Sequence, residues 1–347
     1  MFKTVRSMLL SVMSSRFDEC DTMFSRMYEL EEGTERYSRY YSEHPKMEQR
    51  DRELRTAGGG VFASREAEQR QIDAVFSLIA DLRAFAGHYP QSQKTELSVV
   101  DMDPEEAAGR LKKSAGRLGA FKSGICKTDE SWAYSRRGRG DNYGRPVDEV
   151  LPCTFVLAFE MDEAEINRAP AVEQSVEVVL SYYRAASAAL ALKRIINSWG
   201  YSARAHIDGQ SELILPPAAE AAGIGSIGLH GVLVSKEYGP RIRLAAVTTD
   251  MPLAEDPPSH FKVRNFCKNC GKCAATCPSM SIRAFSDYKD GERFSIDHES
   301  CFGLWREMST DCGVCLAVCP FSHPGRDRAS GRGEAGFLKD FMFGQKD

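Results

Sequence analysis

Eight of the eleven cysteines lie between residues 267 and 319, and this crowding constrains the fold more than any other feature of the chain. Cys267 begins a run of the form C-x2-C-x2-C-x3-C-P, the spacing with which bacterial ferredoxins hold four-iron clusters. Cys301 precedes a second group that repeats the x2 and x3 gaps before Pro320. In two-cluster ferredoxins the last cysteine of a run binds the other cluster. We therefore predict one cluster on Cys267, Cys270, Cys273 and Cys319, and another on Cys277, Cys301, Cys312 and Cys315.

The alternative ligand for so many cysteines is zinc, whose structural sites favour two C-x-x-C pairs. The remaining thiols, Cys20, Cys126 and Cys153, are scattered along the chain, and we expect them to be buried and inert. An odd number of cysteines argues against a disulfide framework. Metal ligation is therefore the expected use of the cysteine-rich region, in a protein that works in the reducing cytoplasm.

The rest of the composition is that of an ordinary folded protein of 347 residues. Forty-five Lys and Arg residues against 49 Asp and Glu residues give a net charge of −4, which provides no general attraction to nucleic acid or to anionic membranes. No apolar run approaches the roughly 18 residues of a membrane helix. Residues 1–13 are interrupted by Ser7 and Ser11 and lack a cleavage site, so we expect an amphipathic surface helix there and no export signal.

Hydrophobic periodicity and turn residues divide the chain into four expected regions. These are a helical N-terminal region over 1–90, an α/β (α+β) core over 91–259, a ferredoxin-like domain over 260–325 and a tail over 326–347. Apolar spacing predicts helices over 66–85, 103–118 and 172–199, the second of them with Asp103 as its N-cap. A buried strand is expected over 151–159, and segments 231–235 and 241–248 are predicted to pair as a hairpin.

Three glycines in the middle of the chain, Gly223, Gly225 and Gly228, fit the pattern G-x-G-x-x-G. This pattern alone is a weak sign of nucleotide binding, and the acidic residue expected about twenty positions later in a dinucleotide fold is not evident. What the glycines do imply is a backbone that approaches a ligand or a neighbouring segment more closely than a Cβ allows. A bound FAD or NAD stays open as an alternative at this stage.

The segment from Gly223 to Leu253, with its Glu-Tyr-Gly-Pro-Arg-Ile-Arg turn, resembles the corrinoid-dependent reductive dehalogenases and, more distantly, the epoxyqueuosine reductases. The similarity to the dehalogenases extends over most of the chain, through residues 18–27, 40–45, 132–135 and 339–344. It implies a base-off cobalamin held between the core and the two-cluster domain, and a histidine-ligand motif for cobalt, D-x-H-x-x-G, is absent. Without a twin-arginine leader, the chain is similar to cytoplasmic, divergent members of that family.

The family resemblance also implies site residues. It assigns the role of proton donor to Tyr182, which without the resemblance would be interpreted as a core tyrosine. The family provides a Lys or Arg after the last glycine of the run to stabilise the phenolate, but Leu229 stands there, and Arg184 or His230 are the candidate replacements. The predicted contacts with cobalamin or substrate are Gln210, Gly223, Gly225, Ser226, Gly228, Leu229 and His230.

The function that the resemblance implies is reductive dehalogenation of an organohalide, with electrons passed through two 4Fe-4S clusters to cobalt from a ferredoxin or flavodoxin. Leu229 favours a second reading, in which the same machinery acts on a substrate without halogen. A tRNA-modifying reductase would call for a basic surface, which the net charge does not predict. A non-catalytic protein that carries electrons or handles corrinoids is the remaining hypothesis.

Overall fold

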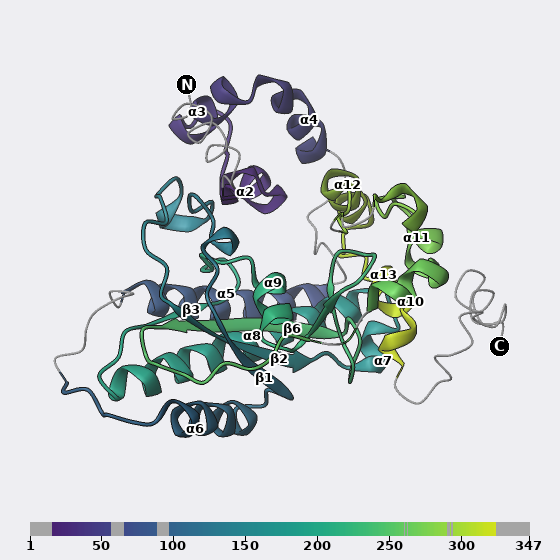
Figure 1. Ribbon diagram of the computed structural model, residues 1–347. Helices are drawn as coiled ribbons and strands as arrows, with labels where there is room; N and C mark the ends of the chain where they lie inside the picture. The colour runs from purple at the N-terminus through teal and green to yellow at the C-terminus, as the bar shows by residue number, and fades with distance from the viewer. Residues whose placement is uncertain are drawn as a thin grey trace, which may run out of the picture.

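The computed structural model describes residues 16–56, 66–88 and 97–323, apart from positions 260, 262, 290, 291 and 293. The segments predicted at residues 1–13, 326–347 and 339–344 therefore lie outside the described residues. The chain is mixed α and β, as predicted, with helices before the sheet, between its strands and around the cysteines (Figure 1). No helix in the described ranges has the length and apolarity needed to cross a membrane.

The core is a four-stranded antiparallel sheet with the strand order β1-β2-β6-β3. The strands are β1 (Lys122–Lys127), β2 (Cys153–Glu160), β3 (Ala203–His206) and β6 (Ile242–Thr249). The central strand β2 is an almost continuous apolar run, because its side chains are buried on both faces of the sheet. Phe155 and Leu157 point to one hydrophobic core, whereas Val156 and Ala158 point to the other.

Helices cover both faces of this sheet. The long helix α8 (Val172–Ser198) and α6 (Pro104–Arg117) pack on the face of Phe155, and α9 (Leu215–Ala221) packs on the opposite face. The predicted N-cap is confirmed, because the Asp103 carboxylate accepts hydrogen bonds from the Glu105 and Glu106 amides. Helix α5 (Glu66–His88) packs against α8 through Ile72 and Ile79, so this part of the predicted N-terminal region belongs with the core.

The predicted hairpin between residues 231–235 and 241–248 is wrong. Strand β5 (Leu233–Ser235) pairs with β4 (Gly225–Ile227) in a separate two-stranded sheet, while β6 pairs with β2 and β3. An isolated bridge joins Ser235 to Gly239, within the turn between the two segments. Gly239 has φ +60°, and a Cβ there would lie 2.4 Å from the Phe321 carbonyl carbon, so the turn is shaped to pack on the cysteine-rich module.

The N-terminal helices are α2 (Met23–Tyr28), α3 (Glu35–Glu43) and α4 (Pro45–Thr56), and of these α2 and α4 lie beside helix α12 of the cysteine-rich module (Figure 1). Arg26 on α2 is buried and pairs with Asp51 on α4 and, at 2.9 Å, with Glu299 on α12. A buried charge is tolerated when it is fully paired, so this cation ties three helices together. The start of the chain is thereby fixed to the module near its end.

The cysteine-rich module contains α10 (Val263–Cys270), α11 (Lys272–Thr276), α12 (His298–Met308) and α13 (Val314–Ala317). Short 3₁₀ turns complete the chain at Glu19–Asp21, Glu130–Trp132, Gly140–Asn142, Phe285–Asp287 and Pro320–Ser322, together with the one-turn helix α7 (Glu163–Ile166). The module is anchored to the sheet by Arg241, whose buried Nε donates to the Ser322 carbonyl at 2.7 Å. The same guanidinium pairs with Glu160 at 3.3 Å, at the end of β2.

Candidate functional site

The two predicted sets of cysteines are gathered at two separate cavities. Cys267, Cys270, Cys273 and Cys319 line a small cavity between α10, α11 and the Pro320–Ser322 turn. Cys277, Cys301, Cys312 and Cys315 line one wall of a much larger cavity, of about 990 Å³. Cys277, the last cysteine of the first sequence group, lies with the cysteines of the second group. Cys319, the last cysteine of the second group, lies with those of the first. Their ligand roles stay a prediction.

The surroundings of these thiols suit cluster ligands. A hydrogen bond from the Leu229 amide lowers the pKa of Cys267, although burial, the larger effect, leaves it raised. Burial likewise raises the pKa of Cys273 and of Cys301 to about 12, so an anionic thiolate at either position needs a cationic metal centre. In the described part of the chain, no three His, Cys, Asp or Glu side chains converge on a point where a single metal ion would sit.

Tyr182 lies on the wall of the large cavity, and so do Gln210 and His230 among the predicted contacts. The phenol is supplied by α8, and the four cysteines face the same space from the module. Apolar and aromatic side chains from α2, α5 and α12 complete the lining. The cavity thus brings together the predicted acid and one predicted cluster, which are far apart in the sequence.

Two arginines that the sequence reading missed stand beside Tyr182. The Arg243 guanidinium lies over the phenol ring, with 3.9 Å between its Cζ and the ring centroid. Burial, the largest influence, raises the pKa of Tyr182, and the charges of Arg243 and Arg139 act in the opposite direction. The signal in the sequence was a charged residue inside the otherwise apolar β6 run, but only folding brings it to α8.

Asp208 holds the second of these arginines in place. Arg139 Nη1 donates to Asp208 Oδ1 at 3.1 Å, and Arg83 from α5 pairs with the other carboxylate oxygen. Burial opposes ionisation of Asp208, yet Arg139 and Arg83 hold its pKa below the usual range. The carboxylate is therefore charged at neutral pH, and it orients two cations on the rim of the cavity.

The candidate replacements for the missing cation, Arg184 and His230, are not among the charged groups that chiefly shift the pKa of Tyr182. Arg184 pairs with Glu177 at 2.5 Å. His230 is buried, and burial lowers its pKa to about 4, so it is neutral at pH 7. Leu229 is fully buried among the apolar side chains of the cysteine-rich module and lines the small cavity. Arg243 and Arg139 supply the charge in their place.

The glycine-rich stretch packs against the chain itself. A Cβ on Gly223 would lie 2.7 Å from the Pro257 carbonyl oxygen, and one on Gly225 would lie 2.3 Å from that of Val234. Ser226 pairs with Val234 in the β4–β5 ladder, and a Cβ on Gly228 would lie 2.9 Å from the Val234 side chain. These residues do not appear on the walls of the large cavity, where Gln210 and His230 do. The cofactor contacts predicted for them remain untested.

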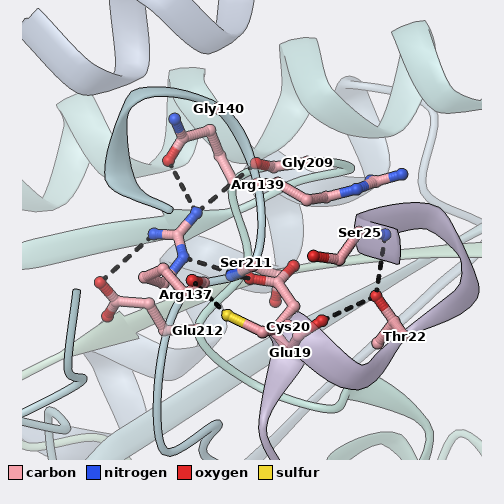
Figure 2. A network of polar contacts seen from close by, with 12 residues as sticks. Glu19, Cys20, Thr22, Ser25, Arg137, Arg139, Gly140, Gly209, Ser211 and Glu212 are labelled. Atoms are coloured by element: carbon pink, nitrogen blue, oxygen red, sulfur yellow. Dashed lines mark hydrogen bonds and ion pairs between the residues drawn. The ribbon is translucent and has the colours of Figure 1, made fainter. Parts of the chain in front are cut away.

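A buried polar network is centred on Arg137, with Glu19 and Glu212 beside its guanidinium (Figure 2). Arg137 Nη2 donates to Gln210 Oε1 at 3.1 Å, and the guanidinium lies 3.5 Å from Glu19 and 3.6 Å from Glu212. The Cys20 thiol donates to the Arg137 carbonyl at 3.4 Å, which confirms a buried, structural place for that cysteine. The network connects the N-terminal segment to the loop that carries Asp208 and Gln210.

This architecture defines a class: an α+β core that shares a deep cavity with a two-cluster, ferredoxin-like module. Residues 266–323 match the 4Fe-4S dicluster domain family. By sequence the chain is similar to the reductive dehalogenases, a group of oxidoreductases. It is 31% identical over 268 residues to the tetrachloroethene reductive dehalogenase of Desulfitobacterium hafniense, covering 63% of this chain and 48% of the relative. It is 28% identical over 257 residues to the tetrachloroethene reductive dehalogenase of Sulfurospirillum multivorans, and the match covers 63% of this chain and 51% of the relative.

A weaker similarity links the chain to the epoxyqueuosine reductase of Aliivibrio fischeri, at 26% identity over 63% of this chain and 67% of the relative. Among solved structures, a catabolic reductive dehalogenase shares the fold, with a TM-score of 0.69 and 22% identity over 89% of this chain and 42% of that one. The structure of the same protein with bound 3-bromo-4-hydroxybenzoic acid matches with a TM-score of 0.64 and 25% identity. The match covers 79% of this chain and 41% of that one. The chain spans about half the length of the curated dehalogenases that it matches.

Proposed function

We propose that this protein is a cobalamin-dependent, iron–sulfur reductase that removes halogen from an organohalide. One observation carries the proposal: a buried tyrosine, flanked by two arginines, shares a cavity of about 990 Å³ with four cysteines of a ferredoxin-like module. The overall reaction takes two electrons and one proton, breaks a carbon–halogen bond, forms a carbon–hydrogen bond and releases halide. The cavity brings the means for both electrons and proton to one place.

The cavity fits a corrin on two counts. Its volume is at the upper end of the range of roughly 300–1,000 Å³ for ligand pockets, which suits a large planar cofactor. Its wall also contains a buried acceptor with no hydrogen-bond partner, Gln174 Oε1. When bound, the corrin would supply a cobalt centre able to reduce the carbon–halogen bond. Gln174, Gln210 and His230 are the residues that we expect to contact it.

Tyr182 would hold the transferred proton at its phenolic oxygen. A phenol is a useful acid when its conjugate base is stabilised, and the charges of Arg243 and Arg139 favour the phenolate. Apolar residues that line the same cavity, among them Phe24 and Trp305, would limit the access of water as a competing proton source when the cavity is filled. These roles belong to the chain's own side chains.

The arginines also bear on the choice of substrate. Arg83, Arg139 and Arg243 stand near one ionised carboxylate, Asp208, so the Tyr182 end of the cavity has an excess of positive charge. This favours organohalides that carry a carboxylate or phenolate. Leu229, which lies inside the module, was the sequence argument for a substrate without halogen. The similarity to an epoxyqueuosine reductase supports the same alternative.

We propose that electrons enter at the cluster of the small cavity and leave at the cluster of the large one. Residues 257–286, which carry four of the eight cysteines, contain no Asp or Glu but include Lys268 and Lys272. A basic surface of this kind suits an acidic, low-potential ferredoxin or flavodoxin. We place the reaction in the cytoplasm, where cysteines stay reduced.

The test is anaerobic reconstitution of the purified chain with iron, sulfide and cobalamin. The proposal expects about eight irons per chain, a paramagnetic signal from base-off cobalt(II), and halide release from a halobenzoate or halophenol with a low-potential reductant. Zinc in place of iron, or no affinity for any corrinoid, would overturn it. Turnover of epoxides or other halogen-free substrates at the expense of organohalides would instead support the second reading.

A further inference from the structure

Gln174 lies in the first turn of α8 and is completely buried, yet its amide is only half satisfied. Its Nε2 donates to Asp311 Oδ2 at 3.2 Å, whereas its Oε1 has no hydrogen-bond partner. The residue lines the large cavity. A buried amide oxygen left unpaired is destabilising, and a ligand donor that reaches it removes that cost.

The orientation of this amide is set by its neighbours. Asp311 accepts hydrogen bonds from both Gln174 Nε2 and Ser175 Oγ, which identifies the nitrogen end of the Gln174 amide. Ser175 Oγ also lies 2.6 Å from Thr310 Oγ1. The carboxylate therefore holds the NH₂ group, and the oxygen is left as the free end.

Gly313 fixes the amide from a second side. It has φ +64°, and a Cβ there would lie 2.8 Å from Gln174 Cδ and 3.0 Å from Oε1. Only glycine allows the module's backbone to approach the amide so closely. Asp311 and Gly313 flank Cys312, so the residues that clamp Gln174 belong to the same loop as a predicted cluster ligand.

We propose that Gln174 Oε1 is a recognition site for a carboxamide, accepting a hydrogen bond from a peripheral amide of the corrin. The proposal rests on the proposed function and names one determinant of cofactor choice. A corrinoid whose side chains are carboxylates would place a carboxylate oxygen against Gln174 Oε1. Both are hydrogen-bond acceptors, and the Asp311 carboxylate is close by. Discrimination between amide and acid corrinoids follows from that geometry.

The experiment measures equilibrium binding of cobinamide, which carries amides, and cobyrinic acid, which carries carboxylates. Both are titrated into the cluster-loaded protein by absorbance. In Gln174→Met, which keeps the volume but loses the acceptor, we expect the preference for cobinamide to fall about tenfold. In Gln174→Glu, where the introduced carboxyl and Asp311 must share a proton in place of the lost Nε2 donation, an acceptor oxygen is kept and the preference should be retained. The matched control is Gln49→Met, at an exposed position on α4.

An unchanged preference in Gln174→Met, with iron content as in the parent protein, would overturn the inference while leaving the proposed function in place. A parent protein that binds neither corrinoid would overturn both. If Gln174→Met loses its clusters, the glutamate variant decides alone, because a tenfold loss of preference in Gln174→Glu contradicts an acceptor role. Iron content is therefore measured beside every titration.

Discussion

The guanidinium of Arg243 stacks on the ring of Tyr182, with 3.9 Å between Cζ and the ring centroid. Arg243 comes from β6 and Tyr182 from α8, and Arg243 Nε also donates to Ser181 Oγ at 3.1 Å. A cation over an aromatic face gains about 0.5–2 kcal/mol, and it gains more when the phenol becomes a phenolate. The stack therefore links the position of the acid to its strength.

Removal of this cation should weaken the acid. Burial already raises the pKa of Tyr182 and Arg243 counteracts it, so Arg243→Gln should raise that pKa further and slow proton donation. We expect halide release at neutral pH to fall about tenfold or more, since each pKa unit corresponds to about 1.4 kcal/mol, with a larger solvent deuterium isotope effect. Arg243→Lys keeps the charge and should recover part of the rate. Equal rates in the parent and Arg243→Gln would contradict the role.

Loss of the phenol itself should be more severe. Tyr182→Phe should lower kcat by about 10²–10⁴-fold, the usual contribution of a general acid, without changing iron content or corrinoid binding. The control is Tyr183→Phe, because the neighbouring tyrosine packs against α5 and is not among the residues that line the cavity. Full turnover by Tyr182→Phe would remove this residue from the mechanism.

The crossed cysteine sets can be tested by iron content and paramagnetic resonance. Cys277→Ser should lose the same cluster signal as Cys301→Ser, because both line the large cavity. Cys319→Ser should match Cys267→Ser, which lines the small one. Each variant should retain about four of eight irons, and Cys153→Ser should retain all. A Cys277→Ser spectrum that matches Cys267→Ser would mean that the sets follow the sequence order instead.

Acid stability should depend on His206. Its imidazole is buried, accepts from the Glu212 amide at 3.2 Å and lies 2.9 Å from Thr248 Oγ1. Burial, assisted by Arg204 and Arg137, lowers its pKa to about 3. Below pH 6.5 the unfolded chain takes up a proton that the folded chain refuses, so stability is lost as the pH falls towards 3.

The measurement is the free energy of unfolding against pH, in denaturant, for the parent and His206→Gln. Between pH 6.5 and 5 the parent should lose about 2 kcal/mol more than the variant, at about 1.4 kcal/mol per pH unit. At pH 7.5 and above the two curves should run parallel. Identical slopes below pH 6.5 would show that the imidazole protonates in the folded state.

Local features were predictable from the sequence because their causes are local. The helix at 104–117 begins where Asp103 caps it, and β2 is almost continuously apolar because it is central in the sheet. The hairpin was predicted because two apolar segments joined by a short turn usually pair with each other, and this prediction is wrong. Strand β6 instead pairs with β2 and β3, which lie about 90 and 40 residues earlier in the chain, so the local pattern could not predict its partners.

What the sequence determined by itself is the two-cluster module, because ligand spacing over a few residues is dictated by the size of a cubane and needs no knowledge of the fold. What only the tertiary structure decided is the chemistry around Tyr182. Its cations come from β6 and from residue 139, and the orphan acceptor Gln174 is defined by a loop more than 130 residues away. No local pattern encodes such contacts, since they exist only after the core and the module have packed against each other.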